Sequence, residues 1–243
     1  MAVAFLVGGF VVSLGLERDG IDPDHAWSIV FWAAVGGIVG SRLLVIFDDW
    51  QGFLDRPLAF LLTGSGFIWY GGLVGGFLSV SAYIVRHGLG WLNVVDAVAP
   101  ALALGHAIGR IGCQVSGDGD WGTPSSLPWA MTYPDAVIGW TTWTQSAGLP
   151  LDVRVHPAPV YETLAYCAIF LALWRWRERE PRAGSLLWLY LLLSSIARFS
   201  VEAIRVEPVI ALGLTQAQWF AIFLAFAASV LLALPPGRAR LAR

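Results

Sequence analysis

Two short segments of this sequence place arginine, glutamate and histidine side chains at helical spacing in apolar surroundings. In ARFSVEAIR, Arg198, Glu202 and Arg205 stand four and three residues apart, which puts all three on one face of a helix. In GHAIGRIGC, His106 and Arg110 are likewise four residues apart. Guanidinium groups can bind two phosphate oxygens at once. If the two faces meet, we expect a cationic site that suits a phosphodiester.

Ionisable side chains in apolar segments are functional candidates, because an arginine at the centre of a membrane helix costs about 2.5 to 3.5 kcal/mol. The alternative interpretation is snorkelling arginines and structural ion pairs between helices. The grouping of arginines with His106 and Glu202 favours a site. The arginines concerned lie within or at the ends of apolar segments: Arg42, Arg110, Arg198 and Arg205.

The elements that carry these residues are those of a membrane protein. Of 243 residues, 57% are hydrophobic and only 13% are charged, against about a quarter charged in soluble domains. No internal repeat is evident, so one polytopic domain covers residues 1–243. The first apolar segment is short, because a full span needs about 20 residues. The pattern predicts an all-α fold with about seven transmembrane helices, at residues 1–16, 27–48, 66–85, 94–115, 159–174, 184–206 and 213–234.

Residues 116–158 differ from the rest of the chain in being rich in Gly, Pro, Trp, Ser and Thr. This composition predicts an extramembrane arm between the fourth and fifth helices. Nine loop arginines fall on one side of the predicted membrane, and only Arg56 and Arg154 fall on the other. By the positive-inside rule the arginine-rich side is cytoplasmic. We therefore expect the arm on the outer side.

Five segments, taken in order, resemble the prolipoprotein diacylglyceryl transferase family. The family's second span, which ends in Gly-x-Arg, is similar to IDPDHAWSIVFWAAVGGIVGSRLL, and its Gly-Gly-Leu-x-Gly-Gly element is similar to SGFIWYGGLVGG. Its Gly-Arg-x-Gly-Asn signature is similar to PALALGHAIGRIGCQVSGDGDWGTPSSLPW. Its His-Pro-x-x-x-Tyr-Glu and Arg-Phe-x-Val-Glu-x-x-Arg motifs are similar to HPAPVYE and ARFSVEAIR.

The resemblance implies a multi-pass protein of the bacterial inner membrane, with seven spans and an active site toward the periplasmic face. It implies phosphatidylglycerol as donor and the lipobox cysteine of a pre-prolipoprotein signal peptide as acceptor. Glycerol phosphate is the leaving group. No cofactor and no metal are implied.

The resemblance also assigns roles to individual residues. Arg110 and Arg198 correspond to the family's essential arginines, and we interpret them as ligands of the phosphate. Glu202 would hold the guanidinium groups, and Arg205 would lie near the outer end of its span, where water screens it. The remaining candidates for substrate binding are Arg42, Asp118, His156, Tyr161 and Glu162.

The acceptor thiol, with a pKa near 8.5, benefits from a base. The candidates are His106, on the face of Arg110, His156, at the outer mouth, and Tyr70, which occupies the place of a family histidine. A site without a dedicated base is the fourth possibility.

Two other functional classes stay open at this stage. Tyr70, and Cys113 in the place of the signature asparagine, are compatible with a non-catalytic or altered-specificity paralogue. Arginines on facing helices are compatible with an anion transporter.

The chain begins within what looks like the family's first span, which predicts a start codon upstream of Met1.

Overall fold

The computed structural model describes residues 2–58, 68–179 and 182–234. Their backbone forms two compact units, one of residues 12–94 and one that joins residues 1–11 to residues 95–243. The first helix, α1 (Ala2–Arg18), contributes to both units.

The unit of residues 12–94 is built on two helices that meet at glycines. A Cβ atom on Gly40 would lie 2.3 Å from the carbonyl oxygen of Gly71, and one on Gly36 would lie 2.5 Å from that of Gly75. Only glycine therefore allows this approach, as is typical of small residues spaced by four in membrane helices. The helices of this unit are α2 (His25–Asp48), α3 (Trp50–Asp55) and α5 (Trp69–Arg86).

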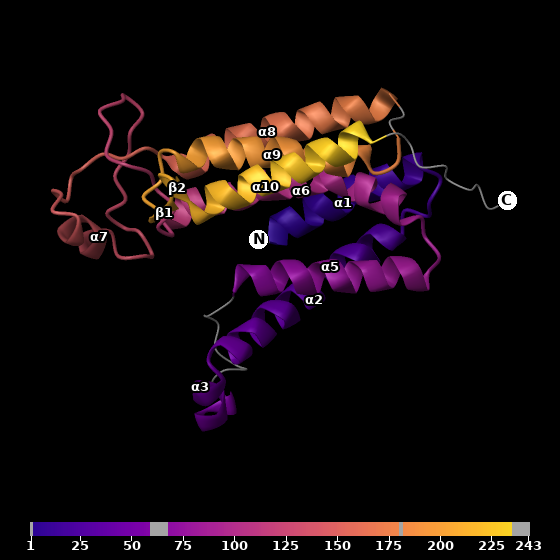
Figure 1. Cartoon of the computed structure of the whole chain (residues 1–243), viewed down its shortest axis with the longest axis horizontal. Helices are drawn as coiled ribbons and strands as arrows, with labels where there is room; N and C mark the ends of the chain where they lie inside the picture. The colour runs from indigo at the N-terminus through magenta and orange to yellow at the C-terminus, as the bar shows by residue number, and fades with distance from the viewer. Residues whose placement is uncertain (1, 59–67, 180–181, 235–243) are drawn as a thin grey trace. The chain divides into compact units, whose positions relative to one another are not determined.

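The other unit contains four long helices, which Figure 1 shows lying side by side. Ala99, Ala103 and Ala107 are spaced by four residues and give one helix a smooth face, which packs in a common core with Tyr166 and Leu173. The four helices are α6 (Trp91–Ser116), α8 (Ala158–Trp176), α9 (Ser185–Glu202) and α10 (Gln216–Ala233), with the 3-10 turn η1 (Arg177–Arg179) after α8.

A buried carboxylate of α6 fixes the beginning of α9. Asp96 accepts hydrogen bonds from the backbone N–H groups of Gly184 at 2.6 Å and Leu187 at 2.9 Å. The first N–H groups of a helix have no partner within the helix, and the N-terminal end favours negative charge. Asp96 therefore connects α6 to α9 at the end of the bundle away from the arm.

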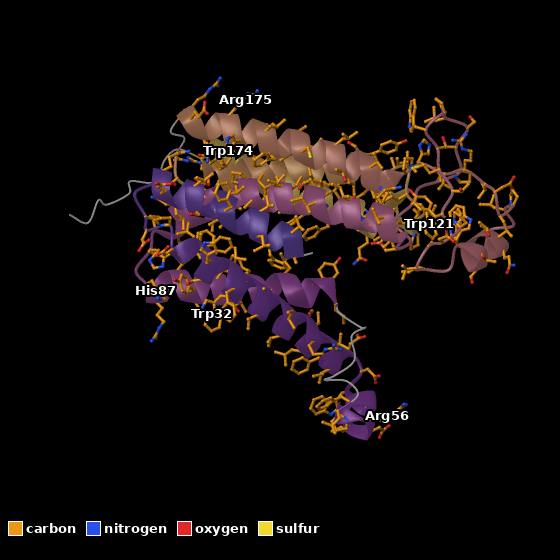
Figure 2. All side chains as sticks on the ribbon, turned by 180° about the vertical axis from the view of Figure 1, so that it is seen from behind. Trp32, Arg56, His87, Trp121, Trp174 and Arg175 are labelled. Carbon is orange, nitrogen blue, oxygen red and sulfur yellow. The ribbon has the colours of Figure 1, made fainter. Side chains whose placement is uncertain are left out.

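The arm between α6 and α8 carries an aromatic core of its own. Trp121, Tyr133 and Trp140 are buried there together with Val155. The ring centroids of Trp121 and Trp140 lie 5.0 Å apart, edge to face. Figure 2 shows Trp121 among the side chains of the arm. The only helix within this arm, all of whose residues the structure describes, is the short α7 (Trp140–Ser146).

The mostly helical fold is confirmed, with corrections at the helix ends, while seven membrane spans and an extramembrane arm stay predictions. Each of the seven apolar segments contains a helix, although the one predicted at 66–85 begins outside the described residues. Among the described residues, α2, α6, α9 and α10 are long and apolar enough to cross a membrane. The all-α prediction missed an antiparallel hairpin, β1 (Val209–Ala211) and β2 (Leu214–Thr215), and the segment predicted to run to residue 206 ends its helix at Glu202.

Candidate functional site

A buried carboxylate of α8 joins the two arginines that the sequence singles out. Glu162 is 1% exposed and forms ion pairs with Arg110 of α6 and with Arg198 of α9. Its Oε1 accepts a hydrogen bond from Nη1 of Arg198 at 2.9 Å. The charged faces of α6 and α9 are therefore joined through a third helix, α8.

The remaining ion pairs close these contacts into a ring. Arg198 Nη2 lies 2.9 Å from Oε2 of Glu202, and Arg205 Nε lies 3.4 Å from the same oxygen. Arg205 Nη2 in turn lies 2.6 Å from Oδ1 of Asp120, whose other oxygen pairs with Arg110. The resulting ion-pair ring alternates positive and negative groups in the order Arg110, Asp120, Arg205, Glu202, Arg198 and Glu162.

The ring corrects the prediction of a cationic site. Three arginines alternate with three carboxylates, so its formal charge is zero. The prediction considered only the two helix faces, on which Glu202 is the one carboxylate. Glu162 and Asp120 join the ring from α8 and from the loop after α6. Removing one member of a buried ion pair typically destabilises a protein by about 3 to 5 kcal/mol, because its partner is left charged and unpaired.

Arg205 also differs from its prediction. It lies beyond the end of α9 rather than on its face, and its side chain is 6% exposed, less than that of Arg110 or Arg198. We expected water to screen Arg205, but its side chain is too deeply buried for this. Its Nη2 makes a further ion pair with Glu207 at 3.0 Å, which adds a negative charge beside the ring.

The loop after α6 brings Asp120 back to Arg110. Gly117 and Gly119 have φ values of 61° and 93°, a region that favours glycine, and they turn the chain directly after the helix. Gly122 then lies against the residues after α9, since a Cβ there would be 2.6 Å from the carbonyl oxygen of Ile204. The glycines before Asp120 therefore turn the loop, and Gly122 after it packs against the chain that follows α9.

Asp120 is the site residue that the sequence did not identify. The resemblance pointed to Asp118 as the acidic residue of the signature, and the prediction for Asp118 as a substrate ligand stays a prediction. The signal that could have found Asp120 is its place directly before Trp121 and Gly122, the tryptophan-glycine element that anchors the arm.

Asp120 and Arg205 lie outside the helices that could span a membrane, and each stabilises the charged form of the other. Burial alone would raise the pKa of Asp120, but the hydrogen bond and charge of Arg205, with the charge of Arg110, outweigh it and hold the pKa below its ordinary value. Burial would lower the pKa of Arg205, but the hydrogen bond and charge of Asp120 outweigh it and raise the pKa. Both groups are therefore charged at neutral pH.

His106 contacts the ring through Arg110. The Nε of Arg110 donates to Nε2 of His106 at 3.3 Å, and the imidazole stacks on the ring of Tyr166 with centroids 3.7 Å apart. The Nη1 of Arg110 also lies 3.8 Å from the sulfur of Cys113. A proton on Nε2 of His106 would face the Arg110 cation, so this geometry suits a residue that orients Arg110.

His156 and Tyr161 form a second polar group, where the arm joins α8. The phenol oxygen of Tyr161 lies 3.1 Å from Nδ1 of His156 and accepts a hydrogen bond from Nε1 of Trp129 at 2.7 Å. The backbone of His156 exchanges hydrogen bonds with the loop, from Gly122 N at 2.9 Å and to Thr123 O at 3.1 Å. The motif His-Pro-x-x-x-Tyr-Glu thus links the loop of Asp120 to Glu162.

Arg42 and Tyr70 lie in the other unit, in α2 and in the first turn of α5. Their predicted parts in the site stay predictions.

A group of potential metal ligands also lies beside the ring. The ligand atoms of Cys113, Asp118 and Asp120 are within 4.8 Å of one another. A cation there would compete with Arg110 and Arg205 for the carboxylate of Asp120. We therefore assign no metal or cofactor to these residues.

A family model and several individual relatives of this chain carry the same description. The family model described as prolipoprotein diacylglyceryl transferase matches residues 1–234. A Clostridium tetani protein named phosphatidylglycerol–prolipoprotein diacylglyceryl transferase is 30% identical over 209 residues, covering 86% of this chain and 79% of the relative. Proteins of the same name are 34% identical in Methylococcus capsulatus (81% and 70% covered) and 32% identical in Bordetella bronchiseptica (95% and 89% covered).

Proposed function

Because the chain belongs to the prolipoprotein diacylglyceryl transferase family, we propose that it transfers the diacylglyceryl group of phosphatidylglycerol to the lipobox cysteine of pre-prolipoproteins. The sulfur of that cysteine forms a bond to the glyceryl CH₂ that carries the phosphate. The C–O bond breaks, its electron pair stays on the phosphate oxygen, and glycerol phosphate departs. The thiol proton leaves with a base or with water.

One observation carries the assignment of the phosphate ligands, namely that Glu162 holds both Arg110 and Arg198. The departing phosphate gains charge in the transition state, so fixed donors at that position lower the barrier without reorganising. A carboxylate shared by two guanidinium groups from different helices supplies such a fixed pair. We assign the phosphate to Arg110 and Arg198 on this basis.

The neutral ring does not prevent an anion from binding. A guanidinium group has five N–H donors, and the ring uses only some of them. Among the described residues, the Nε of Arg198 and the Nη2 of Arg110 take no part in the ion pairs of the ring. A phosphate can therefore join these two arginines while their bonds to Glu162 persist.

The geometry favours His156 over His106 as the base. The Nε2 of His106 faces Arg110, whereas His156 contacts Tyr161 through Nδ1 and makes no side-chain hydrogen bond through Nε2 among the described residues. A base needs a lone pair that can reach the thiol. Tyr70, or no dedicated base, remains the alternative.

We place the site toward the periplasmic face of the bacterial inner membrane, with seven spans. The nine loop arginines on one side of the predicted membrane support this orientation. Labelling of single cysteines placed at Arg154 and at Arg175 with a membrane-impermeant thiol reagent tests it. Labelling of the Arg175 position in intact cells would contradict the orientation.

The transfer itself is tested with purified protein, radiolabelled phosphatidylglycerol and a synthetic lipobox peptide. We expect label on the peptide thiol and no label when the cysteine is replaced by serine. Complementation of a conditional transferase mutant separates this function from that of an altered-specificity paralogue. Absence of both transfer and complementation would refute the proposal, and uptake of anions by proteoliposomes would then favour a transporter.

A further inference from the structure

The end of α8 away from Glu162 carries a groove that the proposed transfer does not use. It is an open surface groove, and its lining comes from α8 and the turn η1 directly after it. Figure 2 labels Trp174 and Arg175 at this end of α8. The lining combines two apolar side chains with three charged ones: Leu171, Trp174, Arg175, Glu178 and Arg179.

The spacing of the lining residues places them on one face of the helix. Leu171, Trp174, Arg175 and Glu178 follow one another at intervals of three, one and three residues, and Leu171 is exposed. Leu173 points the other way, because it is fully buried in the core. The groove therefore opens on the outer face of the bundle.

The groove also lies at the level where a membrane span ends. Figure 1 shows the C-terminal ends of α8 and α10 together at the end of the bundle away from α7. Arg182, which follows η1, donates to the carbonyl oxygens of Leu231 at 2.8 Å and of Leu234, in the last turn of α10 and directly after it. Tryptophan and arginine at such a level are typical of the headgroup region.

The charge of the groove is positive. The guanidinium carbon of Arg177 lies 3.0 Å from the centroid of the Trp174 ring, which holds this cation beside the groove. Arg175 and Arg179 are exposed, and neither makes an ion pair within the described part of the chain. Among the described lining residues, two arginines therefore face one carboxylate, that of Glu178.

We propose that this groove binds an anionic phospholipid of the leaflet at this end of the bundle, separately from the donor that the enzyme consumes. The phosphate lies between Arg175 and Arg179, and an acyl chain passes Leu171 along the exposed face of α8. Trp174 forms the floor beneath the glycerol. The zwitterionic headgroup of phosphatidylcholine lacks the net charge that this arrangement favours.

Native mass spectrometry of the full-length protein in a neutral detergent tests the proposal, with dioleoyl phosphatidylserine and dioleoyl phosphatidylcholine as probes. We expect phosphatidylserine to bind more tightly. Arg175→Gln with Arg179→Gln should weaken its binding roughly 25-fold, from about fivefold for each arginine near a headgroup. Transfer activity should not change, because neither arginine belongs to the ion-pair ring.

The matched control is Arg18→Gln with Arg86→Gln, which removes the same charge from the last turns of α1 and α5. It should leave phosphatidylserine binding within about twofold of the wild type. Equal weakening in the control would show attraction by bulk charge and would overturn the site. Wild-type affinity for phosphatidylserine in the Arg175→Gln, Arg179→Gln variant would also overturn the site. So would displacement of phosphatidylserine by an equal concentration of soluble glycerol 3-phosphate, because the site would then bind phosphate without the lipid.

Discussion

The charge of Glu162 should be indispensable to the site, although this residue does not contact the reacting atoms. Glu162→Gln keeps the size of the side chain but leaves an amide between two guanidinium groups. The amide oxygen can accept from one of them, while its N–H group faces the other arginine, a donor against a donor. The ring then carries a formal charge of +1 in a buried position.

The structure gives a magnitude for this change. Glu162 is 1% exposed and bridges Arg110 to Arg198, so the free energy of unfolding should fall by about 3 to 5 kcal/mol. Turnover should fall about 10² to 10³-fold, the usual cost of one misplaced donor at a developing negative charge. Glu162→Asp should recover part of the stability, because it restores the charge, but little turnover, because it reaches only one arginine.

The assay is transfer of radiolabelled diacylglyceryl to a lipobox peptide, with thermal unfolding measured on the same purified samples. Glu178→Gln is the matched control, because it removes the same charge from the exposed turn directly after α8. We expect both quantities to be unchanged in that variant. Wild-type turnover in folded Glu162→Gln would refute the reasoning that links the ring to the phosphate.

Three further predictions follow from the site. Arg110→Lys should lose nearly as much turnover in the transfer assay as Arg110→Ala, because lysine lacks the planar fork that grips two oxygens; near-normal activity at normal abundance would make Arg110 structural. If His156 is the base, His156→Gln should remove the acid limb of the pH–rate profile and His106→Gln should keep it; the reverse pattern would transfer the role to His106. Since the pKa of Asp120 is lowered in the fold, its contribution to stability is present at neutral pH and is lost as pH falls through that pKa, below about 4. Asp120→Asn should therefore unfold more readily than wild type at pH 7, and this difference should shrink as the pH falls below about 4. A difference that does not change with pH would contradict this.

The helices and the central charges could be predicted from the sequence because their signals are local. Arg110 and His106 stand four residues apart on one helix, and so do Arg198 and Glu202, and the structure keeps both pairs in contact. Apolar runs long enough for a helix likewise need no knowledge of the rest of the fold. The sequence left open whether the faces of α6 and α9 meet, and the structure joins them through Glu162 of α8.

The neutrality of the ring could not be predicted, because its other members depend on the path of a loop. Asp120 reaches Arg205 only because Gly117 and Gly119 adopt left-handed backbone angles and Gly122 lies against the chain after α9. No spacing rule relates residue 120 to residue 205. The early end of α9 was missed for a similar reason, since neither glycine nor proline occurs between Glu202 and Pro208 to mark it.

The ion-pair ring also constrains the order in which the chain can mature in the cell. Synthesis proceeds from the N-terminus, so Arg110 and Asp120 are made before Glu162, and Glu162 is made before Arg198 and Glu202. Until α9 has been inserted, Glu162 can pair only with Arg110, and Asp120 lacks Arg205. A chain that is cut between α8 and α9 therefore keeps Arg110, Asp120 and Glu162 but lacks the other three members of the ring. The ring closes only when α9 and the residues directly after it, which carry Arg205, have joined α6 and α8.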